Sequence, residues 1–193
     1  SFAASGASAS LMGEYWDVAP NTIATIDQAI NAVSGGADPT TATFTSSDIK
    51  YGDPNTNWVI GDLANFLQAD AGSIVGSNTN FQESVVRLTG KVVLNDGDQI
   101  DVTSDDGFRL IIGGTTVSEF LGLRPPNNTT SAVWNGGSGM FHATLWYFEG
   151  QRTQAQLISN LGGFAAPIPV PASALMLISA LGGVVVMRRR KKA

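Results

Sequence analysis

Cysteine is absent from the 193-residue chain, which excludes disulfides, thiol nucleophiles and thiolate metal sites. Histidine occurs once, so metal sites built from several histidines are excluded, and a Ser-His-Asp triad would have to use His142. Charged residues make up only 14% of the chain, and no Asp or Glu follows Glu149. Because residues 188–192 hold five of the 11 Lys and Arg, the body is more acidic than the net charge of −5 indicates. An acidic body argues against nucleic-acid binding.

Glycine, in contrast, occurs 22 times, and short alternating apolar segments recur along the chain. This pattern predicts a mainly β domain over residues 10–163, an antiparallel β-barrel or sandwich with one or two short helices. Helices are expected at 23–33 and 62–69, and strands at 11–16, 41–49, 84–94, 99–104, 107–112, 117–121, 131–134, 140–148 and 154–158. The segment 140–148 is apolar on both faces and should be central. Residues 95–98 and the pair Gly113-Gly114 are expected to form hairpin turns.

The two ends of the chain have the composition of targeting segments. Ala7-Ser8-Ala9 is a small-x-small cleavage pattern, which predicts that residues 1–9 are the remnant of a signal peptide. A small-residue terminus without processing is the alternative. Residues 164–171 are a Pro-rich linker, and the uncharged residues 172–187 precede a basic cluster made of Arg188, Arg189, Arg190, Lys191 and Lys192.

The uncharged segment 172–187 predicts a single transmembrane helix. As a helix it would be about 24 Å long, and extending it to Ile168 brings it close to the ~30 Å of a bilayer core. The basic cluster, read as a stop-transfer signal at 188–193, places the C-terminus in the cytoplasm and the body outside. An amphipathic or core helix is the alternative.

The tail resembles a known sorting signal. Ile168-Pro169-Val170-Pro171-Ala172, the apolar segment and the basic cluster are similar to the VPLPA-type branch of the PEP-CTERM signals. Chain ends of this kind are substrates of exosortase, a membrane-embedded peptidase-transpeptidase of Gram-negative bacteria. The resemblance implies export, temporary membrane anchoring and removal of the tail, in a bacterial envelope that often carries exopolysaccharide.

Two adjacent carboxylates, Asp105 and Asp106, stand between two predicted core strands. Counting strand directions places one rim of the fold around them, together with Arg124, Asn127, Asn128 and Glu149. Ca²⁺ binds six to eight oxygens from carboxylates, amides, carbonyls and water, which this rim offers. In the alternative, Asp105 caps a turn, Asp106 faces solvent, and Glu149 pairs with Arg124 or Arg152.

The body resembles the protective-antigen (PA fourteen) domain, a β-barrel found in bacterial toxins, glycosidases and yeast flocculins. The matching segments are 13–15, 42–44, 104–110, the Gly113-Gly114 turn and 145–150. In the flocculin branch an adjacent Asp pair, joined by a cis peptide, binds Ca²⁺ and through it sugar hydroxyls. The resemblance therefore implies that Asp105 and Asp106 are metal ligands. Asn127, Asn128 and Glu149, which the strand directions place on the same rim, are the candidates for sugar contact.

The remaining polar and aromatic candidates are better explained by structure. A turn accounts for Asp96, Asp98 and Asp101, which lack EF-hand spacing, and core packing accounts for His142 and for Trp58, Trp134, Trp146 and Tyr147. The sequence contains no enzyme constellation. It predicts an exported, exosortase-sorted surface protein that binds carbohydrate or extracellular polysaccharide, with Ca²⁺ as cofactor. The alternatives are a structural matrix or biofilm protein without a specific ligand and, third, a glycosidase-associated module.

Overall fold

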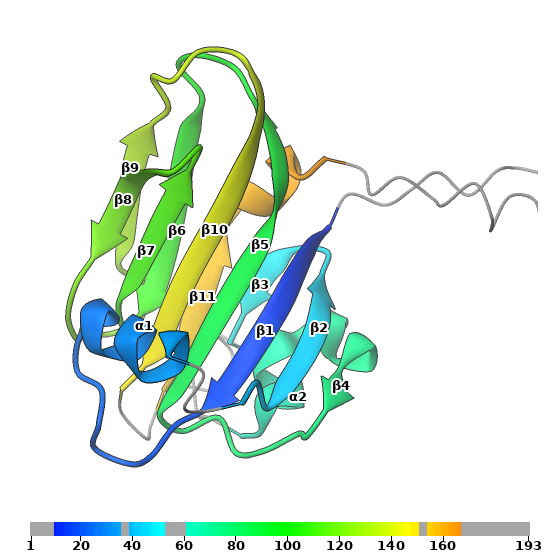
Figure 1. Cartoon of the computed structure of the whole chain (residues 1–193), viewed down its shortest axis with the longest axis vertical. Helices are drawn as coiled ribbons and strands as arrows, with labels where there is room; N and C mark the ends of the chain where they lie inside the picture. The colour runs from blue at the N-terminus through cyan, green and yellow to red at the C-terminus, as the bar shows by residue number, and fades with distance from the viewer. Residues whose placement is uncertain (1–9, 36–38, 53–60, 151–153, 167–193) are drawn as a thin grey trace, which may run out of the picture. The chain divides into compact units, whose positions relative to one another are not determined.

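Two antiparallel β-sheets face each other in the computed structural model, which describes residues 10–35, 39–52, 61–150 and 154–166 (Figure 1). The elements in chain order are β1 (Leu11–Asp17), α1 (Ile26–Ser34), β2 (Ala42–Ser46), β3 (Ile49–Tyr51), α2 (Leu63–Leu67), the 3₁₀-helix η2 (Gln68–Ser73), β4 (Val75–Gly76), β5 (Ser84–Leu94), β6 (Gln99–Asp105), β7 (Phe108–Ile112), β8 (Thr115–Phe120), β9 (Thr129–Val133), β10 (Gly139–Glu149), β11 (Gln156–Ser159) and the 3₁₀-helix η3 (Asn160–Phe164).

The strand order makes the fold a sandwich. Seven strands form one sheet in the order β4-β2-β1-β5-β10-β7-β8, and four form the other in the order β3-β11-β6-β9. The two sheets share no strand in the described part of the chain, so the expected closed barrel is wrong and the sandwich alternative is confirmed. The predicted hairpin between β7 and β8 is confirmed, and Gly113 and Gly114 supply its positive φ angles of 58° and 84°.

The turn at residues 95–98 is not a hairpin, because it carries the chain from β5 in the large sheet to β6 in the small sheet. Asp98 accepts a hydrogen bond from the backbone N–H of Asn95 (2.7 Å), which closes the turn. The next connection, from β6 back to β7, also passes between the sheets. Asp105 and Asp106 lie at this second crossing.

The core forms between the sheets from one face of each strand. Leu88, Leu145 and Leu110 stand in register across β5, β10 and β7, and all three are fully buried. Val102 and Leu157 of the small sheet belong to the same apolar cluster. This alternation of buried and exposed positions explains why sequence periodicity locates most of the strands.

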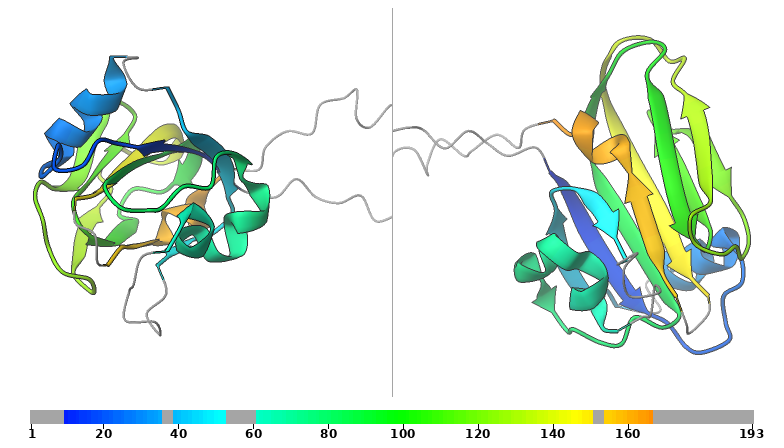
Figure 2. Two further views of the ribbon diagram at one scale, coloured as in Figure 1. Left: turned by 90° about the horizontal axis from the view of Figure 1, so that it is seen from below. Right: turned by 180° about the vertical axis from the view of Figure 1, so that it is seen from behind.

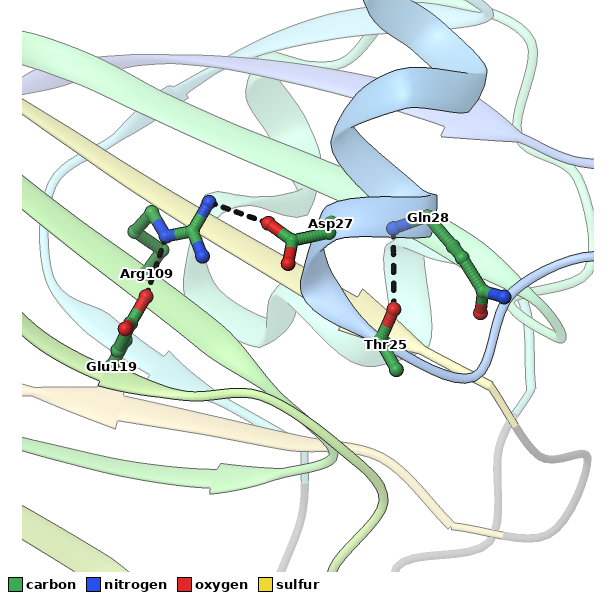
Figure 3. A network of polar contacts seen from close by, with 5 residues as sticks. All are labelled: Thr25, Asp27, Gln28, Arg109 and Glu119. Atoms are coloured by element: carbon green, nitrogen blue, oxygen red, sulfur yellow. Dashed lines mark hydrogen bonds and ion pairs between the residues drawn. The ribbon is translucent and has the colours of Figure 1, made fainter.

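Helix α1 covers part of the outer face of the large sheet (Figures 1 and 2). Thr25 caps it by accepting a hydrogen bond from the N–H of Gln28 (3.3 Å). The guanidinium of Arg109 on β7 links Asp27 of the helix (2.9 Å) to Glu119 of β8 (2.7 Å) (Figure 3). Trp146 belongs to the cluster that α1 covers, and Figure 1 shows β10 inside the sheet. The predicted central position of this strand is therefore confirmed.

The segment between β2 and β5 holds most of the local differences from expectation. Asp62, the first residue of the helix expected at 62–69, caps α2 by accepting a hydrogen bond from the N–H of Asn65 (2.9 Å). The expected strand at 41–49 is divided into β2 and β3, which lie in different sheets. Residues 71–80, where neither a helix nor a strand is expected, contain the end of η2 and the short edge strand β4.

The domain continues beyond residue 163. Ala165 forms a β-bridge with Val92, and the N–H of Ala166 donates to the carbonyl of Lys91 (2.7 Å), so the linker starts later than residue 164. Among the described residues, none of the helices has the length and apolar character needed to cross a bilayer. Trp58 and the predicted segments at 1–9, 167–171, 172–187 and 188–193 lie outside the described residues.

Candidate functional site

The two aspartates lie at the point where the chain leaves β6 and enters β7. Asp105 is 5% exposed and Asp106 is 1% exposed. The peptide bond between them is cis. Gly107 follows, and a Cβ there would lie 2.7 Å from the carbonyl oxygen of Phe120. The crossing therefore requires glycine at this position, and the carboxylates are packed inside the rim.

Two backbone donors hold the side chain of Asp106. Its Oδ1 accepts from the N–H of Arg124 (2.9 Å), and its Oδ2 accepts from the N–H of Gly150 (2.9 Å). The hydroxyl of Ser104 donates to the carbonyl of Asp106 (2.5 Å). Asp106 thus ties the loop after β8 and the loop after β10 to its own turn, and both loops come to the aspartate end as predicted.

Asp105 has the opposite environment. Its Oδ2 is buried and has no hydrogen-bond partner, while its carbonyl accepts from the hydroxyl of Tyr147. A buried carboxylate oxygen without a partner is costly, and a cation offsets this cost. The alternative in which Asp105 caps a turn and Asp106 faces solvent is wrong: Asp106 accepts the capping bonds, and Asp105 holds the unpartnered oxygen.

Glu149 completes a cluster of three carboxylates. One oxygen each from Asp105, Asp106 and Glu149 lies within 4.8 Å of the others, and all three residues are buried. Glu149 is fully buried, so its side chain cannot reach a sugar. The expected sugar contact of Glu149 is therefore wrong. Three acidic groups at such short separation are the oxygen donor set that Ca²⁺ prefers.

Burial favours the protonated form of both aspartates, and repulsion from Asp106 adds to this effect at Asp105. Burial is the main cause that raises the pKa of Asp105 from 3.8 to about 7, and the neighbouring Asp106 carboxylate is the second. The positive charge of Arg124 lowers this pKa, but by less. Burial also raises the pKa of Asp106, although the N–H groups of Gly150 and Arg124 act in the other direction. Both pKa values are raised mainly because burial disfavours the charged form of a carboxyl group.

The loop between β8 and β9 supplies the other predicted residues. Asn127 is exposed, and its N–H donates to the side chain of Gln156 (2.7 Å). Asn128 is also exposed, and its amide donates to the carbonyl of Pro125 (2.8 Å). Of the two, only Asn128 uses its side chain within the loop in the contacts described.

Sequence reasoning did not assign two side chains that support this rim, those of Ser104 and Gln156. Ser104 precedes Asp105 on β6, whereas Gln156 comes opposite Asp105 only through the pairing of β11 with β6, two strands far apart in the sequence. The backbone N–H of Gly150 also contacts the rim, and the matching segment 145–150 had pointed to this end of the fold.

Other candidates lie elsewhere. Asp96 accepts from the N–H of Gly137 (3.1 Å) and Asp98 from that of Asn95, so both serve turns. His142 is exposed on β10, and the expectation that it is packed is wrong. Core packing is confirmed for three of the four aromatic residues expected to be packed: Trp134, Trp146 and Tyr147 are 7%, 7% and 0% exposed.

No protein-family model and no curated protein matches the sequence. Among solved structures, the chain is similar to the PA14 sugar-binding domain from an RTX adhesin, with 27% identity and a TM-score of 0.62. That match covers 77% of this chain and 86% of the other. The PA14 domain of the MpAFP antifreeze protein matches with 22% identity and a TM-score of 0.59, over 77% of this chain and 78% of the other.

A more distant match is the Epithelial Adhesin 9 A domain from Candida glabrata, in complex with Galβ1-4GlcNAc. Its identity is 8% and its TM-score 0.51, over 79% of this chain and 80% of the other. PA14 is the protective-antigen domain named above. The described domain therefore has a PA14-type fold: two antiparallel sheets with two short α-helices.

Proposed function

We propose that this domain binds carbohydrate through a calcium ion held at the Asp105-Asp106 turn. The observation that carries the proposal is the buried, unpartnered Oδ2 of Asp105 within the carboxylate cluster formed with Asp106 and Glu149. The similarity to a domain named as sugar-binding, at 27% identity, supports the choice of ligand.

The donor set favours Ca²⁺ over softer metals. All candidate side-chain donors are oxygens, and the only histidine of the chain, His142, lies several residues from the cluster along β10. Hard carboxylate oxygens suit Ca²⁺, Mg²⁺ and Mn²⁺, and the flexible coordination of Ca²⁺ leaves positions for hydroxyls of a ligand. Bound calcium would supply a positive centre that neutral sugars reach through their hydroxyl oxygens.

The exposed part of the rim is polar. Asn127 and Asn128 lie on the loop whose Arg124 N–H contacts Asp106. An exposed amide can donate to and accept from the same sugar, because it carries both kinds of group. We assign these two residues to sugar contact and the buried Glu149 to the metal side of the site.

Binding without catalysis suits this geometry. Hydrolysis of a glycosidic bond uses two carboxyl groups on opposite sides of the bond, about 5 to 9.5 Å apart. Here one oxygen from each of the three carboxylates lies within 4.8 Å of the others, and two of the residues are adjacent in the chain, so the groups converge on one point instead of flanking a bond. His142 is seven residues from Glu149 along β10, or about 23 Å, so it cannot act as a base at this rim.

We further propose that the protein is exported and sorted to the cell surface by an exosortase-type enzyme. This part rests on the tail of the sequence, where Ile168-Pro169-Val170-Pro171-Ala172, an apolar segment and a basic cluster follow one another. A sugar-binding domain on the outside of the cell would meet extracellular polysaccharide. Anchoring through the apolar segment would precede removal of the tail.

Titration of Ca²⁺ into the full-length chain by calorimetry tests the metal site. The wild type should bind one Ca²⁺, and Asp105→Asn should abolish binding because the replacement removes the charge but keeps the shape. Asp101→Asn is the matched control, because Asp101 lies on the same strand, β6, and accepts from Gln99 (2.8 Å). Absence of binding by the wild type at millimolar Ca²⁺ would reject the proposal in favour of a structural matrix protein.

A further inference from the structure

The side chain of Arg124 makes several contacts with strands outside its own loop, beside the candidate site. Its Nε donates to the carbonyl of Ser104 (3.0 Å), and its Nη2 donates to the Ser104 hydroxyl (2.7 Å). Its Nη1 donates to the hydroxyl of Thr130 (2.9 Å). The planar guanidinium therefore spans β6 and β9, the two neighbouring strands of the small sheet.

The same guanidinium also packs on the large sheet. Its central carbon lies 4.5 Å from the ring centre of Phe120 on β8 and 5.4 Å from that of Phe108 on β7. Strands β8 and β9 are the edge strands of their sheets at this side of the sandwich. The side chain of Arg124 thus bridges the two sheets at an open side of the fold, beside the turn that carries the aspartates.

Both ends of Arg124 act on Asp106. Its backbone N–H holds Oδ1 of Asp106, and its side chain holds the Ser104 hydroxyl that donates to the carbonyl of Asp106. None of its contacts described above is a direct bond from the guanidinium to a carboxylate of the cluster. The guanidinium therefore fixes the position of the turn and leaves the carboxylate oxygens available to a cation.

Resting on the proposed function, we infer that Arg124 is a positioning residue that preforms the calcium site before the ion arrives. Two effects of Arg124 oppose each other: the tether holds the ligands in place and so favours Ca²⁺, whereas its positive charge repels Ca²⁺. The number and geometry of its contacts make the tether the larger effect. Residues that orient metal ligands in this way typically change metal affinity by about 10- to 100-fold.

Two substitutions separate these effects. Arg124→Lys keeps the charge but loses the fork and its stacking, and Arg124→Met loses both the charge and the fork. Calorimetry on the full-length chain should show Ca²⁺ affinity at least about tenfold weaker for both variants. Tighter binding by Arg124→Met, with an unchanged Arg124→Lys, would overturn the inference and assign Arg124 a purely electrostatic role.

A matched control excludes a general loss of stability. Arg109→Met removes another arginine that links two elements of the fold. Arg109 lies on the outer face of the large sheet, where it pairs with Asp27 and Glu119 (Figure 3). It should leave Ca²⁺ affinity within about twofold, because the site does not use it. A wild type that fails to bind Ca²⁺ rejects the proposed function itself, whereas a binding wild type with unaffected Arg124 variants rejects only this inference.

Thr130 decides the question if the Arg124 variants do not fold. Thr130→Val removes one partner of the guanidinium and should weaken Ca²⁺ by about threefold, and Thr130→Ser should restore the affinity because it keeps the hydroxyl. Thr129→Val is the control, since the Thr129 hydroxyl bonds that of Thr103 instead (2.6 Å). Equal Ca²⁺ affinities for Thr130→Val and the wild type would contradict the positioning role.

Discussion

In the absence of calcium, the stability of the domain should fall as pH rises, because of Asp105. Its folded pKa of about 7 lies above its ordinary value of 3.8, so between these values the folded state holds a proton that the unfolded state has lost. The stabilising contribution of Asp105 is therefore fully present below pH 3.8 and is lost as pH rises through about 7. At ~1.36 kcal/mol per pH unit the full shift equals about 4 kcal/mol, and because Asp105 titrates together with the neighbouring carboxyl of Asp106 we expect about half of this, about 2 kcal/mol.

Urea denaturation in a chelator, at several pH values from about 4.5 to 8, measures this effect. Asp105→Asn supplies the reference, because a neutral isostere has no such proton to lose. The difference in unfolding free energy, wild type minus variant, should fall by about 2 kcal/mol across the range. Millimolar Ca²⁺ should restore the stability of the wild type at the upper end, because the ion replaces the proton. A difference that is independent of pH would refute the account of Asp105 as an uncompensated buried carboxylate.

Three further outcomes are expected. At 100 times its dissociation constant, Ca²⁺ should stabilise the wild type by about 2.7 kcal/mol and raise its Tm by about 5–10 °C in calorimetry, and the combined Asp105→Ala and Asp106→Ala variant should show no rise. Gly107→Ala should destabilise the domain by about 1–3 kcal/mol in urea, because the new Cβ would lie 2.5 Å from Phe148 and 2.7 Å from a backbone oxygen, whereas Gly122→Ala, with open space around it, should cost little. Mass spectrometry of the surface form from native cells should find no peptide beyond about Pro171, and an intact basic C-terminus would count against sorting and cleavage.

Local patterns in the sequence were sufficient to predict most of the strands. The bounds of β5 match the expected 84–94, and β10 matches 140–148 to within one residue at each end, because each strand alternates or packs on both faces. The start of α2 at Asp62 and the glycine hairpin at Gly113 followed from side-chain and φ preferences alone. These features depend on neighbours in the chain.

Strand partners could not be predicted in the same way. Residues 95–98 have the composition of a hairpin turn, but the strands on either side of them pair with β1, β10, β11 and β9 instead of each other. Turn composition does not distinguish a hairpin from a crossing between two sheets, because both require the chain to reverse. The choice between a barrel and a sandwich depends on these long-range pairings.

The roles within the aspartate pair also required the structure. Adjacent residues of the same type carry no signal about which one accepts backbone N–H groups, and the donors come from Arg124 and Gly150, far along the chain. The exposure of His142 was missed because the outer face of β10 is covered by α1 only in part. Trp146 and Phe148, at the covered end of this face, make the whole strand look buried on both faces in the sequence.

Binding of the full-length protein to a glycan array, in Ca²⁺ and again in chelator, tests the central claim most directly. The account predicts that the wild type binds one class of glycan in Ca²⁺, that chelation removes the signal, and that Asp105→Asn never shows it while Asp101→Asn does. Equal binding in Ca²⁺ and in chelator, or binding by Asp105→Asn equal to that of the wild type, would contradict a calcium-dependent sugar site at the aspartate turn.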